Sequence, residues 1–337
     1  MSSNETVVFP GPREVTLETS ERPEPAADEV LVRTTKSLIS TGTELTILSG
    51  KYPEDSHWSS YAQYPFRAGY SAIGEVTAAG TDVDEDIVGT TVALGRPHAR
   101  YHTTSPDRCV PVPEIPDEEA SFFNLAGIAM NGVRRGRLDW GETAVVYGCG
   151  LVGQLAARFC HVAGARPVVA VDIAEDRLAY LPADDGIHAL NPETDDPVET
   201  VRSLAHDRLA DVVLEVTGNP AVIPDEFDVL QEPLGRLVIL SSPRDETSLD
   251  LHDYCNSPSY EIIGAHNSSH PRESTPHAPW SRPRHYELFF DLIDGGNVDV
   301  ESLITHRIDA AEAPEMYQRL LEDRSQALGV VLDWTGE

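Results

Sequence analysis

Two patterns of apolar positions divide the chain. In about the first 110 residues, short apolar or alternating runs are separated by Pro, Gly and Asp. This spacing predicts strands over 14–17, 29–32, 72–76 and 91–94, in a compact barrel-like or partly open β domain. After Gly141, continuously apolar strands alternate with helical stripes, which is typical of a parallel sheet covered on both faces. The predicted fold class is therefore α/β, with a doubly wound parallel sheet and a mostly-β second domain.

The parallel part is predicted to start with a strand over 143–147. Apolar residues then recur at helical spacing over 151–163, and Gly164 ends that helix. Further strands are predicted at 167–171, 211–216, 236–241 and 260–264, and further helices at 198–206 and 221–231. Ahead of this part, a helix is predicted to start at the acidic residues 117–120 and to run to Val133. Residues 266–285 are rich in Ser, Pro, His and Arg and are predicted to form a loop. Helices at 286–293 and 311–323 and a strand at 329–333 complete the pattern.

The segment GCGLVG lies between the first strand and the first helix of this parallel part. In this context GxGxxG is typical of a dinucleotide-binding turn. Gly148 allows the tight turn, Gly150 lets the backbone approach a pyrophosphate, and Gly153 lets the helix pack closely on the strand. Leu151 and Val152 begin the helix, whose free N–H groups and positive dipole end favour phosphate.

Asp172 ends the second strand of this unit, and its carboxylate can accept hydrogen bonds from a ribose diol. Because it would repel a 2′-phosphate, NAD is favoured over NADP. The alternative is that Asp172 only caps the next helix. Arg177 either flanks the adenosine or is an ordinary surface arginine. Thr217 and Ser241 follow two further strands, at the carboxyl edge where ligands bind in such sheets.

The order of these elements, the GCGLVG segment, the pattern from Asp172 to Arg177 and the closing ALGVVLDW resemble the medium-chain dehydrogenase/reductase superfamily. In that superfamily both chain ends build a GroES-like catalytic domain. The resemblance implies such a domain at 1–118 and 268–337, and a Rossmann domain at 119–267. It also implies a homodimer, with 260–264 as the exposed edge strand that pairs.

Zinc-dependent members carry their metal ligands at positions that correspond here to Thr41, Tyr70 and Ser71. The residue types that bind zinc at these positions in the family are therefore missing here. The four cysteines show no CxxC spacing, so neither a structural zinc loop nor a disulfide framework is expected. The segments ISTGTE and YPFRAGYSAIGEV instead resemble the branch that contains bacteriochlorophyllide a dehydrogenase. This resemblance implies a dehydrogenase without zinc.

Without a metal, another group must stabilise negative charge on the substrate oxygen. Thr43 matches the family's proton-relay hydroxyl and is the first candidate, and the Tyr70 phenol is the second. Glu44 could orient either group or, with a raised pKa, act as the base. The alternatives are that Thr41 and Thr43 only cap a helix over 44–48, that Tyr70 is a core aromatic, and that Glu44 joins a distant histidine in a metal site. Exposed loops are the expected setting of His98, His102, His266 and His270.

The predicted function is hydride transfer between NAD and a secondary alcohol such as a sugar, a polyol or a ring alcohol. One alternative is an enone or quinone reductase. A second is a NAD-binding sensor or subunit without catalysis. A panel of alcohols and ketones assayed for NADH turnover would separate the last of these from an enzyme.

The 337 residues contain 56 acidic and only 25 basic side chains, a formal net charge of −31. This charge makes nucleic acid an unsuitable partner and is typical of proteins from halophilic organisms. No apolar run approaches the roughly 18 residues of a membrane span, and the first residues, MSSNETVVFPGP, lack an apolar signal core. A cytoplasmic location with no membrane partner is therefore expected.

Overall fold

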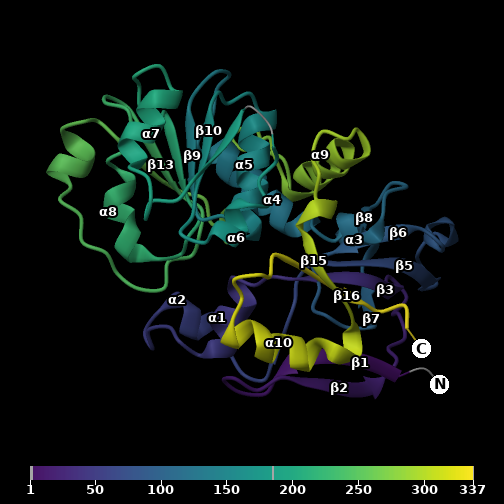
Figure 1. The fold of residues 1–337 in the computed structure, drawn as a ribbon. Coiled ribbons are helices and arrows are strands. Elements are labelled where there is room, and N and C mark those ends of the chain that lie inside the picture. Colours follow the sequence, from purple (N-terminus) through teal and green to yellow (C-terminus); the bar gives the residue numbers. More distant parts are fainter. Residues whose placement is uncertain (1–2, 184–185, 337) are drawn as a thin grey trace. The chain divides into compact units, whose positions relative to one another are not determined.

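The computed structural model describes residues 3–183 and 186–336 (Figure 1). The chain divides into two compact units, one made of residues 1–124 and 286–337 and the other of residues 125–285. The sequence suggested domain boundaries after residues 118 and 267. In the structure the chain passes from one unit to the other after residues 124 and 285. The α/β class with a parallel sheet and a separate β-rich unit is confirmed.

The second unit is built on a six-stranded parallel sheet with the order β11-β10-β9-β12-β13-β14. Read from the first strand, this is the order 3-2-1-4-5-6 of a Rossmann sheet. The strands are short and apolar because both faces are covered, and β9, β10 and β12 are wholly buried. The strands are β9 (Ala144–Tyr147), β10 (Val168–Val171), β11 (Ile187–Leu190), β12 (Val212–Glu215), β13 (Arg236–Ile239) and β14 (Glu261–Gly264).

Helices of this unit connect the strands. They are α5 (Leu151–Val162), α6 (Glu175–Leu178), α7 (Pro197–Leu204) and α8 (Ile223–Glu226), while α4 (Phe123–Arg135) and α9 (Arg282–Asp294) cross the boundary between the units. The helix predicted over 221–231 is wrong in extent, because the chain leaves α8 after a single turn. The edge strand β14 is largely exposed.

The first unit combines strands from both ends of the chain. Its larger sheet has the order β15-β16-β3-β5-β6-β8, with β7 on β3, and a three-stranded sheet has the order β2-β1-β4. The strands are β1 (Ser3–Phe9), β2 (Thr16–Glu21), β3 (Val30–Ile39), β4 (Phe66–Arg67), β5 (Ala72–Ala79), β6 (Thr91–Leu94), β7 (Tyr101–Thr104), β8 (Val110–Pro111), β15 (Ile304–Asp309) and β16 (Gly329–Asp333). Strand β16 pairs with β3 and so joins the last residues to the first forty.

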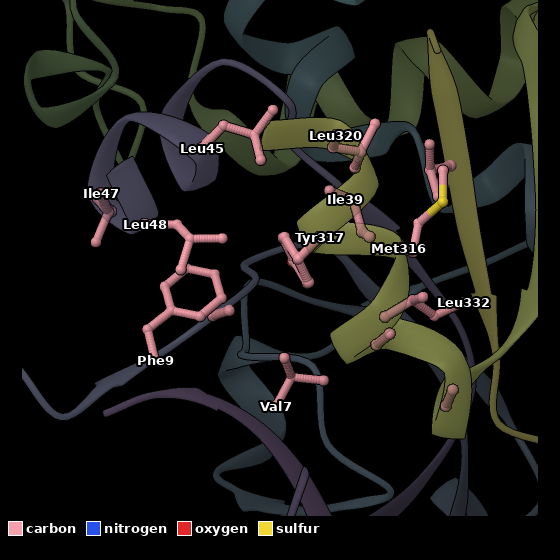
Figure 2. Packing of buried hydrophobic residues seen from close by; sticks show 14 of the residues in the cluster. Val7, Phe9, Ile39, Leu45, Ile47, Leu48, Met316, Tyr317, Leu320 and Leu332 are labelled. Carbon is pink, nitrogen blue, oxygen red and sulfur yellow. The ribbon is translucent and has the colours of Figure 1, made fainter. Parts of the chain in front are cut away.

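The helices of this unit are α1 (Thr43–Ser49), α2 (His57–Tyr61), α3 (Asp117–Ala120) and α10 (Ala313–Glu322). Helices α1 and α10 contribute buried residues to one apolar core, and Trp58 of α2 packs against it. Figure 2 shows Tyr317 on the side of α10 toward Leu48 of α1 and Phe9 of β1, and Met316 and Leu320 belong to the same apolar cluster. This packing places Tyr317 beside α1, although the two segments are far apart in the sequence. Among the described residues, no helix has both the length and the apolar character needed to cross a bilayer.

Candidate functional site

The glycine loop follows β9 and opens α5, as the sequence predicted. A Cβ on Gly153 would lie 1.7 Å from the carbonyl oxygen of Gly148, so only glycine allows this helix to approach the loop. Gly148 has φ +96°, in the region that favours glycine. Gly150 has open space around its missing Cβ, and no side chain caps the helix that begins at Leu151. Free N–H groups facing open space fit a pyrophosphate.

Asp172 at the end of β10 supports this loop directly. Its Oδ2 accepts a hydrogen bond from the Cys149 N–H at 2.7 Å, and its Oδ1 accepts one from the Ala174 N–H at 2.9 Å. Asp172 therefore does more than bond to the turn before α6, because it also links that turn to the glycine loop. Arg177 lies 3.6 Å from the same carboxylate, and its buried Nε has no hydrogen-bond partner among residues 3–183 and 186–336. Arg177 is thus a partly buried side chain beside Asp172.

Sequence reasoning missed Glu215, which ends β12 and is fully buried. One carboxylate oxygen accepts hydrogen bonds from the Thr217 hydroxyl at 2.6 Å and from the Thr217 and Gly218 N–H groups at 2.7 and 2.9 Å. The other accepts the Ser241 hydroxyl. A single carboxylate therefore holds the loops after β12 and β13, and the two predicted hydroxyls donate to it. The strand-like sequence DVVLEV gave one signal, an acid in an otherwise apolar run.

In the other unit, Glu44 is the centre of a buried polar cluster. Its side chain is 1% exposed and accepts the Ser40 N–H at 2.9 Å, while His98 Nε2 lies 3.1 Å away and the Tyr317 hydroxyl donates to it. The other His98 ring nitrogen contacts the Ser37 hydroxyl at 2.8 Å. With these partners and no access to solvent, Glu44 is placed to orient its neighbours. That Glu44 itself acts as the base stays a prediction.

Tyr70 and Thr43 are brought together. The Tyr70 hydroxyl donates to Ser40 Oγ at 2.6 Å and also forms a side-chain hydrogen bond with Thr43. Burial raises the pKa of Tyr70, and nearby Glu44 raises it further. The phenol is therefore protonated at neutral pH and can donate a proton or a hydrogen bond. The Tyr70 carbonyl also accepts the Asn124 amide at 2.6 Å, which fixes the backbone behind the phenol.

Two expectations from the sequence are wrong, the capping alternative for Thr43 and the exposed setting of the histidines. Thr43 is the first residue of α1 and not its cap, because Gly42 is the N-cap residue and provides no side chain. His98, His102 and His270 are buried, whereas exposed loops were expected. Sequence spacing could not reveal the burial of His98, since its partner Glu44 lies 54 residues away in the chain.

Comparisons with known proteins agree with this architecture. Residues 152–278 match the family model "Zinc-binding dehydrogenase". The chain is 24% identical over 354 residues to sorbitol dehydrogenase of Bacillus subtilis, covering 95% of this chain and 94% of that one. It is 25% identical over 344 residues to 2-desacetyl-2-hydroxyethyl bacteriochlorophyllide A dehydrogenase of Cereibacter sphaeroides, covering 97% of each.

Solved structures share the whole fold. A zinc-binding dehydrogenase of Sinorhizobium meliloti, solved with NADP, superposes with a TM-score of 0.78 at 18% identity, covering 99% of this chain and 100% of that one. An alcohol dehydrogenase of Escherichia coli CFT073, solved with NADH, gives 0.79 at 18% identity with the same coverage. Fold and relatives define an oxidoreductase of the alcohol dehydrogenase-like class. The family model and the relatives named as dehydrogenases support an assignment to the medium-chain dehydrogenase/reductase superfamily, and a nicotinamide cofactor is supported.

Proposed function

We propose that this protein is a zinc-independent, NAD-preferring dehydrogenase that interconverts a secondary alcohol and its carbonyl. The observation that carries the proposal is the set of hydroxyls around Tyr70. A protonated phenol stands where zinc-dependent relatives carry a metal ligand, and Ser40 and Thr43 hold its hydroxyl. The substrate class, a sugar, a polyol or a ring alcohol, is suggested by relatives such as the sorbitol dehydrogenase.

The cofactor would be held by the second unit. The N–H groups at Gly150, Leu151 and Val152 would bind the pyrophosphate, and Asp172 would accept hydrogen bonds from the ribose. Both Asp172 oxygens already accept one hydrogen bond each, and a carboxylate can accept about four in all, so capacity remains. When bound, the nicotinamide supplies or accepts the hydride. A negative group at this position favours NAD over NADP.

Proton handling would fall to Tyr70 and Thr43. During reduction, Tyr70 would donate its proton to the carbonyl oxygen, and the Ser40 and Thr43 hydroxyls would stabilise the phenolate that remains. In the opposite direction the phenolate would take the alcohol proton. Glu44 would act indirectly, because it fixes the Ser40 backbone through the 2.9 Å hydrogen bond. A positioned acid of this kind typically contributes 10²–10⁴-fold to rate.

The residues do not fit zinc. The positions that correspond to the family's ligands hold Thr41, Tyr70 and Ser71, and no group of three His, Cys, Asp or Glu side chains suited to a metal occurs in residues 3–183 and 186–336. The nearest set is the pair Glu44 and His98, whose shared space is already filled by Tyr317. This arrangement favours a hydrogen-bonded pair over a metal centre.

The test is turnover of NADH and NADPH against a panel of ketones, sugars and enones in concentrated salt. We expect ketone reduction with NADH, unchanged after chelation, and a loss of about 10²-fold in kcat for Tyr70→Phe. Tyr180→Phe in the other unit is the matched control and should keep full activity. Stoichiometric zinc whose removal abolishes turnover would refute the proposal, and turnover of enones alone would reassign the reaction.

We also propose that the protein forms a homodimer through β14. This strand is the edge of its sheet, and its exposed backbone can pair with a second copy. Sedimentation of the intact chain tests this proposal.

A further inference from the structure

A cavity of about 270 Å³ lies in the first unit, beside β1 and β7. Its walls include Asn4, Thr6, Arg67, Arg96 and His102, and they contain no acidic residue. In a chain with 56 acidic and 25 basic side chains, a cavity with two arginines and no carboxylate is unusual. It is separate from the cluster around Tyr70, since neither Thr43, Glu44 nor Tyr70 lines it.

Neither arginine in the cavity wall is neutralised. Within the described part of the chain, no acidic side chain forms an ion pair with Arg67 or Arg96. Arg96 is fixed by a hydrogen bond from its guanidinium to the Thr103 carbonyl at 3.1 Å, which leaves other donors of the group free. Glu5 lies on β1 between the wall residues Asn4 and Thr6, but it does not neutralise either arginine of the wall, because it forms an ion pair with Arg100 at 2.7 Å.

His102 supplies the second observation. It is 7% exposed, and its Nε2 has no hydrogen-bond partner in the part of the chain that the structure describes. The remaining ring nitrogen, Nδ1, hydrogen-bonds the backbone of Pro97. Burial, together with Arg96 and His98, lowers the pKa of His102 to about 4. The imidazole is therefore neutral in the free protein, and a buried polar atom is unsatisfied, which is costly unless a ligand binds it.

We propose that this cavity binds a small tetrahedral oxyanion, sulfate or phosphate, the latter either free or as a monoester. The guanidinium groups of Arg67 and Arg96 neutralise it, as planar donors commonly do for such anions. The Asn4 amide adds a donor, because its Oδ1 already accepts the Tyr101 N–H at 2.9 Å. His102 takes up one proton from solvent at Nε2 and donates it as a hydrogen bond. No covalent bond forms or breaks.

Proton uptake gives the proposal a measurable signature. Sulfate does not titrate between pH 5 and 8, so any pH dependence of its affinity reports on the protein. If one proton accompanies the anion, affinity rises by about tenfold for each unit of pH lowered, between the His102 pKa in the complex and that in the free protein. Titration calorimetry in buffers of different ionisation enthalpy counts the proton directly.

The experiment titrates sulfate, inorganic phosphate and glycerol 3-phosphate into the intact protein at fixed ionic strength. We expect sulfate to bind at pH 5.5 with uptake of close to one proton, and at least about tenfold weaker binding by Arg96→Gln and by Arg67→Gln. His102→Gln should bind with no proton uptake and a flat pH profile. Tighter binding of glycerol 3-phosphate than of phosphate would identify a monoester as the ligand.

Arg272→Gln is the control, because it removes the same charge from an exposed position in the other unit. It should leave sulfate affinity unchanged. Circular dichroism of each variant is used to check that it remains folded. The proposal is overturned if the wild type binds none of the three anions at pH 5.5, or if a folded Arg96→Gln variant binds sulfate as tightly as the control.

Discussion

Replacing Glu226 with glutamine should stabilise this protein at neutral pH. Glu226 ends α8 and is fully buried, and neither carboxyl oxygen has a partner among the described residues. Burial, with Glu215 and Asp225 nearby, raises the pKa of Glu226 to about 10. The folded protein therefore keeps a proton that the unfolded chain releases above pH 4.5.

The magnitude follows from this difference. Each pKa unit corresponds to about 1.4 kcal/mol, so between pH 4.5 and about 10 the wild type loses about 1.4 kcal/mol of stability per pH unit on this account. At pH 7 the accumulated cost is about 3 kcal/mol, and below pH 4.5 it vanishes because the carboxyl group is then protonated in both states. Glutamine is neutral at every pH and avoids the cost. The buried glutamine amide still lacks a hydrogen-bond partner, and this lowers the unfolding free energy of the variant by an amount that does not change with pH.

Chemical denaturation of wild type and Glu226→Gln at pH 5, 6, 7 and 8, at constant high salt, measures the difference in unfolding free energy. We expect that difference to favour the variant increasingly with pH. The control is Glu246→Gln, at an exposed position, which should give no slope of this size. A difference that is the same at all four pH values would show that Glu226 is not held protonated, and the reasoning from its burial would be wrong.

Three further predictions concern the cofactor unit. Gly153→Ala should abolish NADH binding and lower the melting temperature, because the added Cβ would lie 1.7 Å from the Gly148 carbonyl oxygen. Gly150→Ala should weaken NADH binding and leave the melting temperature unchanged, because the added Cβ has open space. Equal melting temperatures for the two variants would contradict this reasoning. Asp172→Asn should raise the ratio of kcat/KM for NADPH to that for NADH by about tenfold or more, since the charge that repels the 2′-phosphate is removed, and an unchanged ratio would argue against a ribose contact. Glu215→Gln should weaken NADH binding by about tenfold in fluorescence titration, as the loops after β12 and β13 lose a shared acceptor, and unchanged affinity would limit this carboxylate to a structural role.

Local patterns in the sequence predicted much of the cofactor unit. The GCGLVG turn, the apolar strands and the stripe of α5 are features of neighbouring residues, and their spacing depends only on the geometry of strand and helix. Asp172 follows its strand directly, so its place at the carboxyl edge was also predictable. The extent of α8 was not predictable in this way. The helix ends after Glu226, and tertiary packing can override the helix propensity of the residues that follow.

The contacts among the hydroxyls of Ser40, Thr43 and Tyr70 could not be predicted from local patterns. Thr43 and Tyr70 could be selected by their correspondence to positions in a family, but nothing in the local sequence connects them. Tyr70 also donates to Ser40, which directly follows β3 and whose backbone N–H is held by Glu44. Glu44 in turn contacts His98 and Tyr317, which lie 54 and 273 residues away in the chain.

The class of fold, the glycine-rich turn after β9 and the excess of acidic residues follow from composition or from residues within one turn or strand of each other, so they can be read from the chain alone. Which polar side chains share a buried space depends on how the chain folds in three dimensions. The pairing of β16 with β3 and the packing of α10 on α1 bring distant residues within hydrogen-bonding distance. A buried polar group must find partners wherever the folded chain provides them, and that choice is made in three dimensions.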